Sequence, residues 1–105
     1  MVASENAVNT EDVLEGVFHF DPGDGIYREH FPGYPVVPGS LIVHAFLTAV
    51  REAEIKGDVL SIENVRFREF LKPGRYPFRM EFGENRILCS ISRGDKKLVT
   101  GVMKI

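Results

Sequence analysis

Two histidines flank a short segment rich in proline and glycine, and their spacing favours acid–base chemistry. His30 opens the segment HFPGYPVVPGSLIVH and His44 closes it, 14 residues later. The prolines stiffen the chain, and a helix that starts near Gly39 and Ser40 would offer free N–H groups to a polarised carbonyl oxygen. A rigid base beside such donors suits removal of a proton α to a carbonyl group.

Each of these residues also fits a purely structural role when it is taken alone. A histidine in a proline-rich loop can simply be hydrogen-bonded there, and His44 fits a satisfied histidine of a buried helix. His19, His30 and His44 are too widely spaced, without cysteine partners, to predict a metal site. The Gly39-Ser40 pair lacks the G-x-S-x-G elbow of serine hydrolases. We therefore expect no metal and no cofactor.

The elements that must position these histidines follow from the pattern of apolar residues. One helix is expected from Ser40, its candidate cap, to about residue 54, and it is apolar nearly all round, which predicts burial. Residues 13–20 read as a strand, and prolines exclude a long helix from 26–38. Further strands are expected at 59–70 with a bend near Asn64, at 76–82, at 86–92 and at 97–105. An α+β fold with a curved antiparallel sheet around one central helix buries that helix most simply.

Composition sets the class of protein. The chain has 105 residues, 44% of them hydrophobic and 27% charged, which suits one core and one domain. We expect a flexible polar segment over residues 1–12 and a single domain over 13–105. The sequence shows neither an apolar run of membrane-spanning length nor a signal-like N-terminus, and its single cysteine, Cys89, excludes an internal disulfide. We therefore predict a cytoplasmic protein without membrane contact, with Cys89 as a core thiol.

The net charge of −2 hides an uneven distribution. Residues 1–31 carry one basic and seven acidic side chains, whereas the remainder carries twelve basic and eight acidic ones. The excess in the second half indicates either an acidic partner or a solvated strand face. Nucleic acid is not favoured, because phosphate binding normally needs a stronger positive excess. Strand alternation sends Arg66 and Arg68 to one face and Phe67 to the other.

The histidine segment resembles the signature of the β-hydroxyacyl-acyl carrier protein dehydratases, a family with the hotdog fold. That signature reads approximately H-F-P-G-x-P-V-M-P-G-x-L-I-x-E-A. The Val65-Arg66-Phe67-Arg68 strand and the Pro73-Gly74 turn resemble the later strand and turn of the family, in the same order. Matching residues of the signature are His30, Phe31, Pro32, Gly33, Pro35, Val36, Pro38, Gly39, Leu41, Ile42 and Ala45.

The resemblance implies a hydro-lyase and assigns its site. His30 would be the base that removes the α-proton of a 3-hydroxyacyl thioester, and the N–H of Gly39 would bind the thioester carbonyl. The loop histidine and the helix side chain would come from opposite subunits, so a homodimer or a dimer-based oligomer is implied. The substrate would be a thioester of acyl carrier protein or of coenzyme A. Substrate-binding residues would be Phe31, Gly33, Val36, Pro38 and Ser40, and a basic rim for the carrier would be Arg66, Arg68, Lys72 and Arg75.

One departure from the signature leaves alternatives open. His44 stands where the family has an acidic residue, and Thr48 stands where it has a glutamine. A histidine can protonate the leaving hydroxyl only as imidazolium, which makes His44 a substitute acid in the enzyme hypothesis. The alternatives are a non-catalytic relative, which binds acyl chains or acyl carrier protein or pairs with an active subunit, and a hotdog thioesterase.

Overall fold

One antiparallel sheet and two helices make up the part of the chain that the structure describes. The structure is a computed structural model, and it describes residues 3–9, 12–29, 35–53 and 58–105. The sheet has the strand order β1-β2-β4-β5-β6-β3. The elements are β1 (Ala3–Asn9), β2 (Val13–Phe20), α1 (Ile26–Glu29), α2 (Gly39–Glu52), β3 (Ser61–Phe67), β4 (Gly74–Gly83), β5 (Arg86–Arg93) and β6 (Lys96–Lys104).

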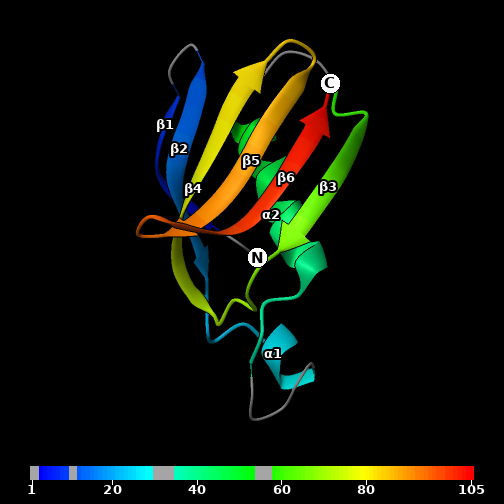
Figure 1. The fold of residues 1–105 in the computed structure, drawn as a ribbon. Coiled ribbons are helices and arrows are strands. Elements are labelled where there is room, and N and C mark those ends of the chain that lie inside the picture. Colours follow the sequence, from blue (N-terminus) through cyan, green and yellow to red (C-terminus); the bar gives the residue numbers. More distant parts are fainter. Residues whose placement is uncertain (1–2, 10–11, 30–34, 54–57) are drawn as a thin grey trace.

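The sheet curves around α2, which lies along its inner side (Figure 1). Ile42, Ala45, Phe46, Ala49 and Val50 form the buried face of the helix. They pack against apolar side chains that alternate along the strands, as the period-two pattern predicts. This arrangement confirms the predicted α+β fold, a curved antiparallel sheet around one central helix.

Aromatic side chains of neighbouring strands fill the centre of the core. The rings of Phe18 on β2 and Phe78 on β4 stack with their centroids 4.0 Å apart, and Phe46 of α2 meets Phe18 edge-on at 5.4 Å. Cys89 is buried on β5 in the same core, which confirms the prediction of a core thiol. Contacts of this kind hold the helix at a fixed depth against the sheet.

The N-terminal residues differ from the prediction. Residues 3–9 form β1, which pairs with β2 from Ala3↔His19 to Asn9↔Leu14, with a register shift between Glu5 and Val8. The prediction of a flexible segment is wrong for these residues, because main-chain hydrogen bonds to an existing strand order a polar sequence that has no apolar alternation of its own.

The start and the burial of α2 also need correction. The helix begins at Gly39 with Pro38 as its N-cap, and no side chain caps it, so Ser40 is not the cap. Only one face is buried in a single chain, and Ser40 and His44 are exposed. The burial all round that the apolar residues of the helix predict is therefore not reached within a single chain, since the sheet covers one side of the helix.

The edge strand β3 is bent as expected. Asn64 has a φ of 54°, and the pairing of β3 with β6 shifts register between Glu63 and Arg66. Asparagine tolerates this left-handed conformation better than most residues. The bend turns the end of β3 toward the start of α2, where the ring of Phe67 comes close to Gly39.

Candidate active site

The start of α2 is held in place by the segment that follows β3. Val37 donates its N–H to the carbonyl oxygen of Leu71 at 2.8 Å, which ties the chain before the helix to the chain after the strand. The carbonyl oxygen of Pro38 accepts the N–H groups of Leu41 and Ile42 at 3.0 and 3.2 Å. The N–H groups of Gly39 and Ser40 thus open the helix, where intrahelical acceptors are lacking.

Gly39 permits a close approach of an aromatic ring. A Cβ atom at this position would lie 3.1 Å from the Cζ atom of Phe67. That separation is tight for two carbon atoms, so glycine lets the ring pack against the helix start. The first N–H groups of the helix are thereby placed beside an apolar wall.

This wall belongs to a cavity that we call the apolar hollow. It has a volume of about 420 Å³. Two segments far apart in the sequence build it: the end of the proline-rich segment with the start of α2, and the end of β3 with the residues after it. Its lining consists of Val36, Val37, Pro38, Gly39, Ile42, Phe67, Glu69, Phe70 and Leu71. An apolar hollow with a few polar groups at one end is typical of a small-molecule site.

Glu69 is the one carboxylate in this lining. Lys96 forms an ion pair and a hydrogen bond with it, and Arg93 lies 3.9 Å away. The hydrogen bond from Lys96 and its charge lower the pKa of Glu69. Glu69 is therefore an anion at neutral pH and cannot serve as the proton donor that an elimination of water needs.

His44 lies on the exposed side of α2, outside the apolar hollow. Its Nε2 atom is 3.4 Å from Oγ1 of Thr48, one helical turn further along. Of the predicted substrate residues, Val36 and Pro38 line the apolar hollow together with Gly39, whereas Ser40 is exposed and does not. His30, Phe31 and Gly33 lie outside the described residues.

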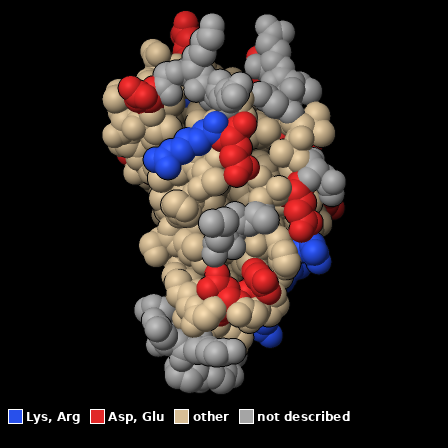
Figure 2. Space-filling view, turned by 180° about the vertical axis from the view of Figure 1, so that it is seen from behind, with Lys and Arg blue, Asp and Glu red and all other residues tan. Residues whose placement is uncertain are grey.

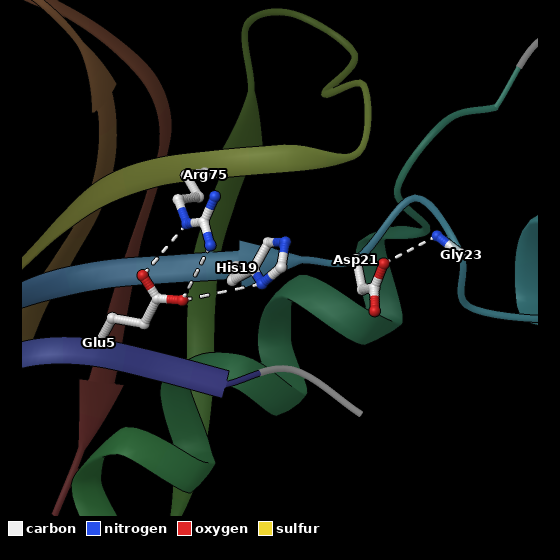
Figure 3. A network of polar contacts seen from close by, with 5 residues as sticks. All are labelled: Glu5, His19, Asp21, Gly23 and Arg75. Atoms are coloured by element: carbon white, nitrogen blue, oxygen red, sulfur yellow. Dashed lines mark hydrogen bonds and ion pairs between the residues drawn. The ribbon is translucent and has the colours of Figure 1, made fainter.

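The four residues of the predicted basic rim do not form one group. Arg75 on β4 donates to the carboxylate of Glu5 on β1, with Nε and Oε2 at 3.1 Å, and His19 of β2 lies beside the same carboxylate (Figure 3). Arg66 and Arg68 line a different hollow, on the outer face of the sheet. Lys72 is exposed ahead of β4. The role of all four in carrier binding stays a prediction.

Two buried groups have a raised pKa. Burial raises the pKa of the Cys89 thiol to about 12, so this residue is protonated and unreactive at neutral pH. Burial, with the nearby carboxylates of Asp24 and Asp21, raises the pKa of Tyr27 to about 12. The Tyr27 hydroxyl is buried and has no hydrogen-bond partner among the described residues. Tyr27 belongs to α1, three residues before His30.

Neither a metal cluster nor a membrane helix is found in the described ranges. Within them, no three histidine, cysteine, aspartate or glutamate side chains are grouped closely enough to hold a metal ion. No described helix combines the length and the apolar character needed to cross a membrane.

The chain after β3 contributes residues to the apolar hollow that the sequence did not predict. Phe67, Phe70 and Leu71 line the apolar hollow because the Val37–Leu71 hydrogen bond joins residues that are 34 positions apart. Local periodicity carries no signal for such a contact. Phe70 is 82% exposed, and two phenylalanines flanking two charged residues at the end of a strand are the one signal that points to an apolar surface there.

The curved antiparallel sheet around α2 and the cavity at the helix start define a protein with the hotdog fold. Comparison with known proteins gives the family. The sequence model described as "ApeI-like: ApeI dehydratase" matches residues 6–101. The chain belongs to the ApeI-like dehydratase family.

Similarity to individual proteins supports this family assignment. The chain is 31% identical over 95 residues to 3-hydroxyacyl-(acyl-carrier-protein) dehydratase FabZ of Bacillus pumilus, covering 83% of this chain but 65% of that protein's length. The dehydratase heterocomplex ApeI:P from Xenorhabdus doucetiae includes a chain similar in structure, with a TM-score of 0.84, 19% identity and coverage of 99% of this chain and 96% of that one. A thioesterase from Haemophilus influenzae, HI1161, has a TM-score of 0.65 at 16% identity, covering 97% of this chain and 74% of that one. The two structures show the shared fold.

Proposed function

We propose that this protein eliminates water from a 3-hydroxyacyl thioester to give the 2-enoyl thioester. The observation that carries the proposal is the opening of α2 into the apolar hollow, where Gly39 and the motif residues Val36 and Pro38 line one cavity. An N–H group at a helix start stabilises negative charge on a carbonyl oxygen, and an apolar wall suits an acyl chain. Membership of a dehydratase family supports the same reaction.

The chemistry assigns one step to each polar group. His30 takes the proton from the α-carbon, and the electrons of that C–H bond move toward the thioester carbonyl, whose oxygen accepts a hydrogen bond from the N–H of Gly39. The electron pair then returns to form the C=C double bond as the bond from the β-carbon to the hydroxyl breaks. His44, as imidazolium, gives its proton to the leaving hydroxyl, which departs as water.

We further propose that the site is completed by a second subunit. Within one chain His44 lies on the exposed side of α2, away from the apolar hollow, so the groups that must meet at one substrate do not share one cavity. Figure 2 shows the face opposite to the view of Figure 1, on which neutral side chains predominate and lysine and arginine are few. Val43 and Leu47 are only half-buried on α2. Covering this side of α2 with a second copy would bring His44 into an enclosed site.

A non-catalytic partner subunit is the second candidate function. The observation that favours it is His44 at the place of an acidic residue, together with the structural likeness to a subunit of a dehydratase heterocomplex. In that case the chain would bind acyl chains or acyl carrier protein and leave proton donation to another subunit. His44→Glu would then gain activity that the unchanged protein lacks.

The test is turnover of carrier-bound and coenzyme A-bound (3R)-hydroxyacyl thioesters of several chain lengths. With the unchanged protein, we expect the mass of the thioester to fall by the mass of one water molecule. His30→Ala should lower the rate of this reaction by about 100-fold or more, the usual contribution of a general base. His19→Gln is the matched control, since this third histidine lies on β2 beside Glu5. No turnover by the folded protein on any substrate, or equal turnover by His30→Ala, would refute the proposal.

A further inference from the structure

The outer face of the sheet carries a second cavity, which we call the outer hollow. Its lining residues lie on β3, β4, β5 and β6 and directly after β3. Its volume is about 360 Å³, an order of magnitude above the roughly 30 Å³ that one water molecule occupies in the liquid. The lining consists of Asn64, Arg66, Arg68, Glu81, Leu88, Cys89, Ser90, Lys97, Thr100, Gly101 and Val102.

Strand register explains why polar side chains gather here. Ser90 on β5 pairs with Thr100 on β6, and Thr100 pairs with Arg66 on β3, so these residues form one row across three strands. The N–H of Arg68 donates to the carbonyl oxygen of Leu98 at 2.8 Å, which continues the contact of β3 with β6. Arg66 and Arg68 thus share the outer face, whereas Phe67 between them lines the apolar hollow on the inner face.

The positive charge of the outer hollow is not neutralised within the described part of the chain. Most other basic residues of the sheet are paired: Arg75 with Glu5, Arg79 with Glu15 and Glu81, Arg93 and Lys96 with Glu69, and Lys104 with Glu63. Arg66, Arg68 and Lys97 form no ion pair with a described residue. Arg86, at the start of β5, forms no ion pair with a described residue either, but it stands alone outside the lining of the outer hollow. Glu81 is the one carboxylate in the lining, and the guanidinium of Arg79 lies 2.9 Å from it.

The donor set fits a phosphate group. Guanidinium groups bind phosphate oxygens with two parallel hydrogen bonds, and a lysine ammonium and serine or threonine hydroxyls add further donors. We propose that the outer hollow binds a phosphate group, esterified or free, through Arg66, Arg68, Lys97, Ser90 and Thr100. The site is separate from the apolar hollow, and its phosphate chemistry does not rest on the proposed dehydration.

The phosphate could belong to a pantetheine arm, to a nucleotide or to free phosphate, and paired probes separate these sources. Calorimetric titrations would compare phosphopantetheine with pantetheine, AMP with adenosine, and inorganic phosphate alone. We expect the phosphorylated member of at least one pair to bind at least about tenfold more tightly, a step of 1.4 kcal/mol, and to weaken as salt rises. The pair with the larger difference identifies the source, and phosphate binding without any such difference would restrict the site to the free ion.

Variants test whether the binding occurs in the outer hollow. R66Q/R68Q should weaken binding of the phosphorylated probe about tenfold or more, and Lys97→Gln should weaken it less. The matched control is R86Q/K104Q, which also removes two positive charges. Arg86 on β5 and Lys104 on β6 lie opposite each other in the sheet, and neither residue lines the outer hollow. Equal loss in the control, or unchanged binding in both R66Q/R68Q and Lys97→Gln, would overturn the proposal. Absence of binding by every phosphorylated probe would overturn it as well.

The outcome is independent of the turnover assay. Phosphate binding is measured without any acyl group, so a protein that binds phosphopantetheine but eliminates no water would refute only the proposed dehydration. A protein that eliminates water but binds no phosphorylated probe would refute only the outer hollow. Should R66Q/R68Q fail to fold, Lys97→Gln and Ser90→Ala still test the site from two other strands.

Discussion

His44 is exposed on α2, with Thr48 as its polar neighbour one turn away, and this position determines what it can do. An exposed imidazole in a single chain cannot act on a substrate in the apolar hollow. A second subunit that covers this side of α2 would remove water from the ring and place it near the substrate. At the scale of the residue, His44 is therefore a proposed donor whose role depends on assembly.

Cys89 gives a pH prediction at the same scale. Burial raises its pKa to about 12, whereas an unfolded cysteine has a pKa of about 8.5. Below pH 8.5 both states keep the proton, and as pH rises toward 12 the unfolded state loses it first. The free energy of unfolding should then fall by up to about 1.4 kcal/mol per pH unit above the unfolded pKa.

Denaturant titrations between pH 7.5 and about 9.5, under reducing conditions, would measure this slope. Cys89→Ala removes the titrating group and should flatten the slope, whatever its effect at neutral pH. The raised pKa of Tyr27 acts in the same direction but starts near pH 10, above this window. Identical slopes for the two proteins would contradict the account of the buried thiol.

The pairing of β2 with β4 depends on a close approach at the scale of the element. Gly16 pairs with Phe78, and a Cβ atom at Gly16 would lie 2.8 Å from the ring of Phe78 and 3.0 Å from the carbonyl oxygen of Glu5 on β1. The Phe78 ring is buried and stacked on Phe18, so a shift of the ring away from a new methyl group would disturb this stacking. The glycine lets three strands and the ring pack together.

Gly16→Ala should therefore destabilise the protein by about 1–3 kcal/mol, the usual cost of overpacking a core. Thermal and urea unfolding would measure the change. Gly25→Ala is the control, since a Cβ atom there meets nothing within 4 Å, and it should stay within about 0.5 kcal/mol of the unchanged protein. Equal stability of the two variants would show that β1, β2 and β4 are packed less tightly than described.

Elements with a local signal could be predicted from the sequence, and those that depend on distant contacts could not. The alternation of Tyr76, Phe78 and Met80 and the apolar residues of α2 are local, and the predicted strand and helix formed there. β1 depends on main-chain pairing with β2, and the Arg75–Glu5 ion pair joins residues 70 positions apart. Of the site, the motif predicted Val36, Pro38 and Gly39 in one cavity but gave no sign of the wall after β3.

In the whole molecule, the two sides of the sheet differ in charge and in shape. The outer face carries basic residues and the outer hollow, whereas the side bearing α2 has few basic side chains (Figure 2) and leaves one face of this helix exposed. The first side suits a charged ligand, and the second suits another subunit. We therefore propose that two subunits share each dehydration site, with His30 from one and His44 from the other.

Mixing two inactive variants is the decisive test of a shared site. His30→Ala and His44→Ala would be unfolded together and refolded as a mixture, and the rate of water elimination measured against each variant alone. In a random mixture half of the dimers hold both variants, and one of their two sites keeps both histidines, so about a quarter of the normal rate should return. If the site lies within one chain, the mixture should stay as inactive as its components, and that result would contradict the account.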